Sequence, residues 1–324
     1  MSDYWKLRNQ ELKHIEESMK SDAAYKGHLT RLYNRVEKDI AKDIAADLEG
    51  FAYRDGVSMT EARKIASKTD VQAFQDTAKR YVETRDFSDR ANRELRRYNV
   101  TMRTNRLELL EAKINLLSVD MANEEEGLLQ RHLAKEALKE YERQAGILKM
   151  TVPSDRQLER MFNSVLTAQF EGATFSDRIW ANQAELRDGI NRTIERTIIR
   201  GENPRVAARE LRGLVSENFK GKHGTGGAKY AADRIAITES ARVQTYVQKE
   251  AFQEAGITQY YIIQEPSACG ICDGMAVVRE KTNDGSKGKV VEEIKHDMAD
   301  LEPGIEAPPF HPNCKCSIAA VSDR

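Results

Sequence analysis

The chain has 324 residues, of which 51 are basic and 52 acidic, and its formal net charge is −1. This balance gives no overall attraction to nucleic acid or to a membrane surface, so contact with either would require a local basic patch. No apolar run approaches the roughly 18–20 residues that cross a bilayer, and the first residues lack the pattern of a secretory signal. We therefore expect folding in a reducing cytoplasm and no membrane partner. The mean hydropathy of −0.65 favours long, solvated helices over a thick core.

Residues 1–150 are expected to form a long helical region, either a bundle or a coiled-coil hairpin. Apolar side chains recur every three or four residues along 29–51, which places them on one face of a helix. A second stripe at 107–128 has the heptad-like spacing of helices that pair within the chain or with a neighbouring copy. Between the stripes, Ser58 and Glu61 form a capping box. The two stripes consist of Leu29, Leu32, Val36, Ile40, Ile44, Leu48 and Phe51, and of Leu107, Leu110, Ile114, Leu117, Met121 and Leu128.

Arginine is concentrated between residues 85 and 106. Guanidinium groups neutralise phosphates and release their counterions, so this segment is a candidate contact with double-stranded DNA. The acidic residues of the same segment support the alternative that it is an ordinary solvated helix face. The residues chosen as candidate DNA contacts are Arg93, Arg96, Arg97 and Arg103.

Residues 151–256 are expected to form a second helical domain. The stretch 146–153 has the composition of a boundary, and Ser154 with Gln157 forms a capping box that begins a helix. The glycine-rich stretch 221–227 lacks the order of a phosphate-binding loop and is interpreted as a linker before a strong helix at 228–256. An intervening helix should end near Gly201, and Pro204 suits the first turn of the next one. The apolar face of the intervening helix consists of Ile179, Leu186, Ile190, Ile194 and Ile198.

Residues 257–324 are expected to form a small β-rich unit. Segments 259–264, 276–278, 290–291 and 317–321 are rich in strand-forming residues, and Asp284-Gly285 is typical of a turn. Few large apolar side chains are available for a core, and units of this size usually depend on a staple such as a metal ion. The predicted fold is thus mainly α, with a stapled α+β unit at the C-terminal end.

All four cysteines fall within this last unit. Cys269 and Cys272 form a C-x-x-C pair, a spacing that allows both thiolates to bind one tetrahedral Zn²⁺. The second pair of ligands must come from His311, Cys314 and Cys316. Spacing alone leaves Cys314 and Cys316 as rivals, and the preferred set is Cys269, Cys272, His311 and Cys316. Such a closed set of four ligands is typical of structural zinc rather than catalytic zinc.

Other interpretations of the cysteines are less well supported. A redox pair would require a thioredoxin-like βαβ pattern, and a disulfide framework would require an oxidising compartment. A zinc-stapled nuclease would need a catalytic histidine and further ligands. After Cys269 only His296 and His311 are available, and the polar surroundings of His296 indicate a surface residue. We therefore expect no enzymatic activity.

Three segments resemble the phage Mu F-like minor head protein family, also called phage head morphogenesis proteins. The helix residues 234–242 are similar to an Arg-x-x-Thr-Glu-x-x-Arg pattern of that family, and Cys269-x-x-Cys272 is followed by Asp273-Gly274. Residues 308–316 (PPFHPNCKC) are close to the signature Pro-Pro-x-His-Pro-x-Cys-Arg-Cys, with Lys315 in place of the commoner arginine. The resemblance covers roughly residues 155–324.

The resemblance implies a minor capsid protein of a tailed bacteriophage that acts in head assembly, DNA packaging or DNA delivery. Its implied partners are the portal protein and the major capsid or scaffold proteins, and its implied location is the virion, with assembly in the host cytoplasm. The alternative function is a zinc-containing DNA-binding protein that accompanies or protects the phage DNA end, and a metal-dependent nuclease is less favoured.

The polar residues of the helix at 234–242 have two interpretations. They can brace the helix against the zinc unit or contact the portal, or they can be a solvated ion-pair face. The resemblance favours the brace. The residues in question are Arg234, Thr238, Glu239 and Arg242.

Overall fold

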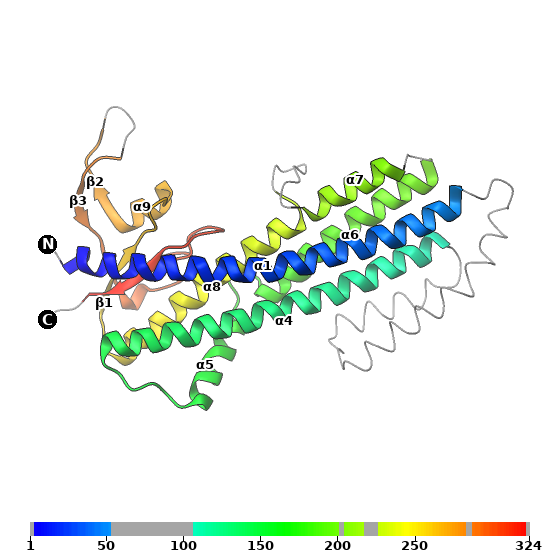
Figure 1. Ribbon diagram of the computed structural model, residues 1–324. Helices are drawn as coiled ribbons and strands as arrows, with labels where there is room; N and C mark the ends of the chain where they lie inside the picture. Colours follow the sequence, from blue (N-terminus) through cyan, green and yellow to red (C-terminus); the bar gives the residue numbers. More distant parts are fainter. Residues whose placement is uncertain (1–2, 53–105, 201–203, 217–225, 283–286, 322–324) are drawn as a thin grey trace. The chain divides into compact units, whose positions relative to one another are not determined.

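The computed structural model describes residues 3–52, 106–200, 204–216, 226–282 and 287–321 (Figure 1). Four sequence predictions lie wholly or mostly outside these residues: the capping box at Ser58, the arginine-rich segment 85–106 apart from Arg106, most of the glycine-rich stretch 221–227, and the turn at Asp284-Gly285. No helix among the described residues is long and apolar enough to cross a membrane.

The structure divides into two compact units built from interleaved segments. The helical unit comprises His28–Glu126 and Ile179–Ala232. The mixed unit comprises Met1–Gly27, Gly127–Arg178 and Asp233–Arg324. Four helices contribute residues to both units: α1 (Asp3–Ala52), α4 (Arg106–Leu148), α6 (Phe175–Arg200) and α8 (Ala228–Glu254). Helix α4 ends at Leu148 and α8 ends at Glu254, near the predicted boundaries at 150 and 256, whereas the mixed unit extends across both positions.

The helical unit buries part of each apolar stripe that the sequence shows. From α1 it buries Leu29, Leu32, Val36 and Ile40, and the short helix α7 (Pro204–Val215) adds Leu211 and Val215. In α4, the predicted residues Leu110, Ile114 and Met121 are buried. Leu117 is only partly buried, and its neighbour Leu116 is buried instead. Helix α6 contributes Ile179, Leu186, Ile190 and Ile194. Proline begins α7 because its missing N–H would have no partner within the first turn.

The mixed unit combines helix segments with the strands. Helix α5 (Asp155–Thr167) begins after Ser154, whose backbone N–H donates to Gln157 Oε1 at 3.2 Å. Strand β1 (Gln259–Ile263) lies between β4 (Lys295–Asp297) and β5 (Ser317–Ala320) in an antiparallel sheet. Strands β2 (Val277–Arg279) and β3 (Val290–Glu293) form a separate antiparallel ribbon beside the short helix α9 (Gly270–Ala276) (Figure 1). A 3₁₀ turn, η1 (Met298–Asp300), follows β4.

The core of the mixed unit is small. Strand β1 supplies its centre with Tyr260, Ile262 and Ile263, all fully buried. Residues of α1, α8, α9, η1 and β5 pack around them. The prediction of a mainly α fold with a small β-rich C-terminal unit is confirmed.

A fully buried carboxyl group lies inside the helical unit. Glu125 of α4 accepts hydrogen bonds from the Tyr33 hydroxyl of α1 at 3.0 Å and from Gln183 Nε2 of α6 at 2.8 Å. Asn182 Nδ2 donates to the same Tyr33 hydroxyl and to the carbonyl of Ala228, so the cluster joins α1, α4, α6 and α8. Burial raises the pKa of Glu125 to about 7, although the two hydrogen bonds oppose this change.

We predict that Glu125 makes the stability of the helical unit depend on pH. Its pKa is higher in the folded state, so its contribution is complete below the ordinary glutamate pKa and is lost as pH rises through about 7. The loss should be on the order of 3 kcal/mol. Urea unfolding at about pH 5 and about pH 8 should show the wild type weakening by more than Glu125→Gln, whose side chain is neutral at both. If the free energy of unfolding fell equally between the two pH values in the wild type and in Glu125→Gln, the prediction would be contradicted.

Candidate metal centre

The C-x-x-C pair lies at the start of α9. Cys269 is the residue immediately before the helix, and the backbone N–H of Asp273 donates to its carbonyl at 2.9 Å, which closes the first turn. Cys272 belongs to that turn and is buried, whereas Cys269 is exposed. Because the helix begins between the two cysteines, their sulfur atoms lie 3.8 Å apart.

The second group of candidates lies in the loop before β5. A turn brings the backbone N–H of Cys314 to the His311 carbonyl at 3.1 Å, with Asn313 in the left-handed region at φ 65°. Asparagine tolerates this conformation better than most residues. Cys314 and Cys316 are both buried, and Phe310 and Ala268 pack against them.

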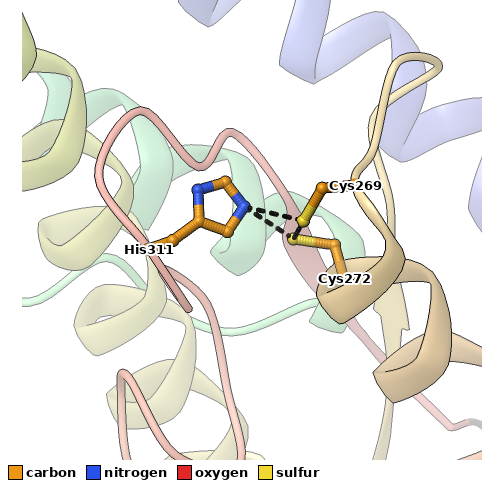
Figure 2. A group of neighbouring side chains, drawn as sticks. All are labelled: Cys269, Cys272 and His311. Atoms are coloured by element: carbon orange, nitrogen blue, oxygen red, sulfur yellow. Dashed lines mark hydrogen bonds between the residues drawn. The ribbon is translucent and has the colours of Figure 1, made fainter. Parts of the chain in front are cut away.

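The two segments meet at Cys272. Its sulfur lies 3.7 Å from Cys314 Sγ and 3.1 Å from His311 Nε2, and the same Nε2 lies 3.3 Å from Cys269 Sγ (Figure 2). The donor atoms form two triads that share Cys272: one with Cys269 and His311, the other with Cys314 and Cys316. All five residues selected from the sequence are therefore gathered in one candidate metal site.

The imidazole of His311 is oriented as a metal ligand would be. Its Nδ1 lies 2.9 Å from the carbonyl oxygen of Pro312, which can only accept, so Nδ1 carries the hydrogen. In the neutral ring, Nε2 then has a free lone pair, and Figure 2 shows Nε2 facing the sulfurs of Cys269 and Cys272. A ligating histidine commonly donates its other N–H to a carbonyl in this way.

The local electrostatics favour thiolates at two of the cysteines. A hydrogen bond from the backbone amide of Cys272 lowers the pKa of the Cys269 thiol. Hydrogen bonds from the side chains of Cys272 and Cys316, with the backbone amides of Cys316 and Phe310, lower the pKa of Cys314 to about 3. The thiolate is the form that binds a metal ion, and these hydrogen bonds favour it at Cys269 and Cys314, whereas the hydrogen bond with Cys314 raises the pKa of Cys272.

Helix α8 contacts the Cys/His loop through Thr238. The Thr238 hydroxyl donates to the Arg234 carbonyl at 2.7 Å and accepts the backbone N–H of Asn313 at 3.1 Å. One side chain thereby fixes the residue before Cys314 to the helix. Arg234 itself takes part through its carbonyl, and its side chain is half-buried.

Glu239 and Arg242 form the buried part of the same helix face. Glu239 is 1 % exposed and accepts from Arg242 Nε of its own helix and from Arg178 Nη1 of α6, each at 2.6 Å. Arg242 is fully buried and also donates to the carbonyl of Val165 in α5 at 3.0 Å. Arg178 further donates to the carbonyl of Phe170. This pattern differs from a solvated ion-pair face, because the charges are buried and link three helices.

The loop between η1 and β5 also packs on Phe170. Gly304 has a φ of 93°, and a Cβ there would lie 2.8 Å from Phe170 Cε2. Only glycine fits both constraints, so Gly304 allows the loop that carries the second group of donors to approach the α5–α6 connection.

Sequence reasoning missed the residues that anchor β5 directly after Cys316. The Ser317 hydroxyl donates to Glu11 Oε2 of α1 at 3.0 Å and lies 2.9 Å from the side-chain nitrogens of both Gln244 and Gln248. Arg143 of α4 holds the Glu11 carboxylate in turn, at 2.7 and 3.1 Å. No local spacing could indicate these contacts, since they join residues far apart in the chain.

Asp273 is a second residue that sequence reasoning did not select for a role. It accepts from Arg279 Nε at 2.7 Å and from Gln264 Nε2 at 2.8 Å, which connects α9 to β2 and to the end of β1. The Arg279 guanidinium lowers the pKa of this carboxyl. Asp273 thus fixes the C-x-x-C turn against its surroundings.

The expectation that His296 is a surface residue is wrong. Its side chain is 11 % exposed, its Nε2 lies 2.8 Å from the carbonyl of Met275, and its ring stacks on Tyr260 at 5.3 Å between centroids. The polar neighbours suggested exposure, but β4 pairs with β1 and places Tyr260 opposite His296.

The candidate DNA contacts Arg93, Arg96, Arg97 and Arg103 lie outside the described residues.

Comparison of the chain with known protein families, with curated proteins and with solved structures finds no match.

We predict that Glu239 is essential to the stability of the mixed unit. Glu239→Gln removes the negative charge that compensates Arg242, which is fully buried, and loss of one partner of a buried ion pair typically costs about 3 kcal/mol or more. The matched control is Lys139→Gln, because Lys139 pairs with Glu136 at 2.8 Å while half-exposed. That change should cost less than about 1 kcal/mol. Urea unfolding of both variants measures the difference, and similar losses would show that the buried pair has no special role.

Proposed function

We propose that this chain is a minor head protein of a tailed bacteriophage, of the Mu F-like type, in which the Cys/His centre holds a structural zinc ion. The supporting observation is that the three segments with the family resemblance belong to one site. The C-x-x-C turn provides Cys269 and Cys272, the PPFHPNCKC segment provides the other donors, and the Arg-x-x-Thr-Glu-x-x-Arg helix contacts that segment through Thr238.

The donor geometry suits zinc. With Zn–S bonds of about 2.3 Å and tetrahedral angles, ligand sulfurs should lie about 3.8 Å apart. The distances from Cys272 Sγ to Cys269 and Cys314 are 3.8 and 3.7 Å. Three thiolates and one imidazole close the coordination sphere and leave no position for a reacting water, so we propose a structural role without catalysis.

We infer Cys314 as the fourth ligand beside Cys269, Cys272 and His311. Its sulfur lies 3.7 Å from Cys272 Sγ, which fits the tetrahedral spacing, and the hydrogen bond from the Cys272 side chain lowers the pKa of Cys314 and so favours the ligating thiolate. The sequence alone preferred Cys316 for this position. Cys316 would then complete the apolar and sulfur surroundings of the ion, and Ser317 next to it would anchor the strand.

Zinc content tests the centre. The purified wild-type chain should contain one zinc ion, measured by elemental analysis, because four donors saturate one tetrahedral ion. Separate Cys269→Ser, Cys272→Ser, His311→Ala and Cys314→Ser variants should lose most of it. Cys316→Ser should keep it, and His28→Gln is the control, since His28 belongs to the helical unit and its Nδ1 lies 2.8 Å from Arg31 Nη2. Zinc retained in all variants, or absent from the wild type, would refute the centre.

Loss of zinc should also destabilise the mixed unit, because metal binding in so small a unit is coupled to folding. A chelator should lower the melting temperature of the wild type and leave that of the Cys272→Ser variant unchanged. An identical melting temperature with and without chelator in the wild type would argue against a structural ion.

The role in the phage head is tested on the particle. Quantitative mass spectrometry of purified virions of the encoding phage should find this chain in far fewer copies than the major capsid protein, and it should co-purify with the portal protein. The DNA-binding alternative predicts instead that the isolated chain shifts DNA, with affinity falling steeply between about 50 and 200 mM salt. Absence from virions together with such a shift would replace the proposal by that alternative.

A further inference from the structure

A groove in the mixed unit lies away from the cysteines. Its walls come from three elements: Tyr141 of α4, Leu158 and Met161 of α5, and Glu250 and Glu254 of α8. The linker 151–154 between α4 and α5 completes it. The groove is open to solvent and has a volume of about 580 Å³, within the range of about 300–1,000 Å³ that is usual for ligand-binding clefts.

The lining of the groove is partly apolar. Val152 of the linker is 44 % exposed, and Pro153 and Met161 are half-buried beside it. An apolar side chain from another molecule could therefore be removed from water here, in contact with Val152 and Met161.

The charge of the groove has one sign. Glu250 and Glu254 are both exposed and stand four residues apart on α8, and the described residues that line the groove include no Lys, Arg or His. Like charges at this spacing repel each other. Glu254 also lies in the last turn of α8, where the helix dipole is negative and no basic residue is present.

The position of one carboxylate is fixed. The buried Tyr141 hydroxyl donates to Glu254 Oε2 at 2.6 Å, which holds the carboxylate at the groove wall. A cation bound here would meet an acceptor whose position is already fixed. The carboxylates can accept two N–H···O hydrogen bonds from one guanidinium.

We propose that this groove docks a peptide segment of a partner protein that presents Arg or Lys beside a large apolar side chain. The apolar lining would take the apolar side chain, and Glu250 and Glu254 would take the cation. The uniformly negative charge rejects nucleic acid and other phosphates. The proposal does not depend on zinc or on a role in the phage head, because none of the groove residues belongs to the metal centre.

Peptide arrays probed with the full-length chain test the docking. The probe peptides are octapeptides with two basic and two apolar residues at all spacings. Matched arrays replace the basic residues by Glu or the apolar residues by Ser. We expect the basic-apolar set to bind about tenfold more strongly than either matched set.

Variants assign the binding to the groove. The double variant Glu250→Gln, Glu254→Gln should reduce affinity for the best peptide by about tenfold, and Val152→Ser should weaken it through the lost apolar contact without a change of charge. A double variant at exposed carboxylates elsewhere, Glu142→Gln with Glu292→Gln, is the matched control and should bind like the wild type. Melting temperatures verify that the variants are folded.

Two results would overturn the docking proposal: no preference for the basic-apolar set, or a groove variant that is folded and binds as strongly as the wild type. The Cys272→Ser variant separates this result from the metal centre. If it loses zinc but still binds the peptide, the two sites are independent, and failure of one leaves the other standing.

Discussion

The central constraint on the mixed unit is that a small sheet with little apolar material must be held by other contacts. Cys272 is at the centre of these contacts. Its sulfur lies close to Cys269 in the same turn and to His311, Cys314 and Cys316, which come much later in the chain. Every other feature of the site, from Thr238 to Asp273, positions the C-x-x-C turn or the loop before β5.

Buried charge provides the second kind of support. Glu239 lies between two arginines and links α8 to α5 and α6, while Glu11, Glu140 and Arg143 form a similar group between α1 and α4. Burial opposes ionisation of Glu140, but hydrogen bonds from His14 and Arg143 outweigh it and lower its pKa to about 2. Loss of one partner from such a group is costly, because it leaves an uncompensated charge in the interior.

The sequence predicts the helices well and the tertiary contacts poorly, for physical reasons. Helical periodicity is a local property, so the stripes along α1, α4 and α6 could be recognised directly. Helix α9 was missed because its seven residues include two glycines, and β4 because Lys295-His296-Asp297 contains no strand-forming residue. The metal candidates were found because every cysteine of the chain lies between residues 269 and 316, and His311 stands close to two of them in the sequence. The partners of Glu239 and Ser317 could not be found, since pairs far apart in sequence leave no local signal.

The contact between Glu11 and Ser317 joins residues 306 positions apart. A ribosome therefore completes α1 long before the hydroxyl that Glu11 accepts has been made. During that interval the carboxylate has Arg143 as a partner only after α4 emerges, and β5 can be fixed only after all the other described elements of the unit have been made. The mixed unit must consequently assemble after β5 has been translated, and a nascent chain arrested before β5 would present an unfinished centre to its surroundings.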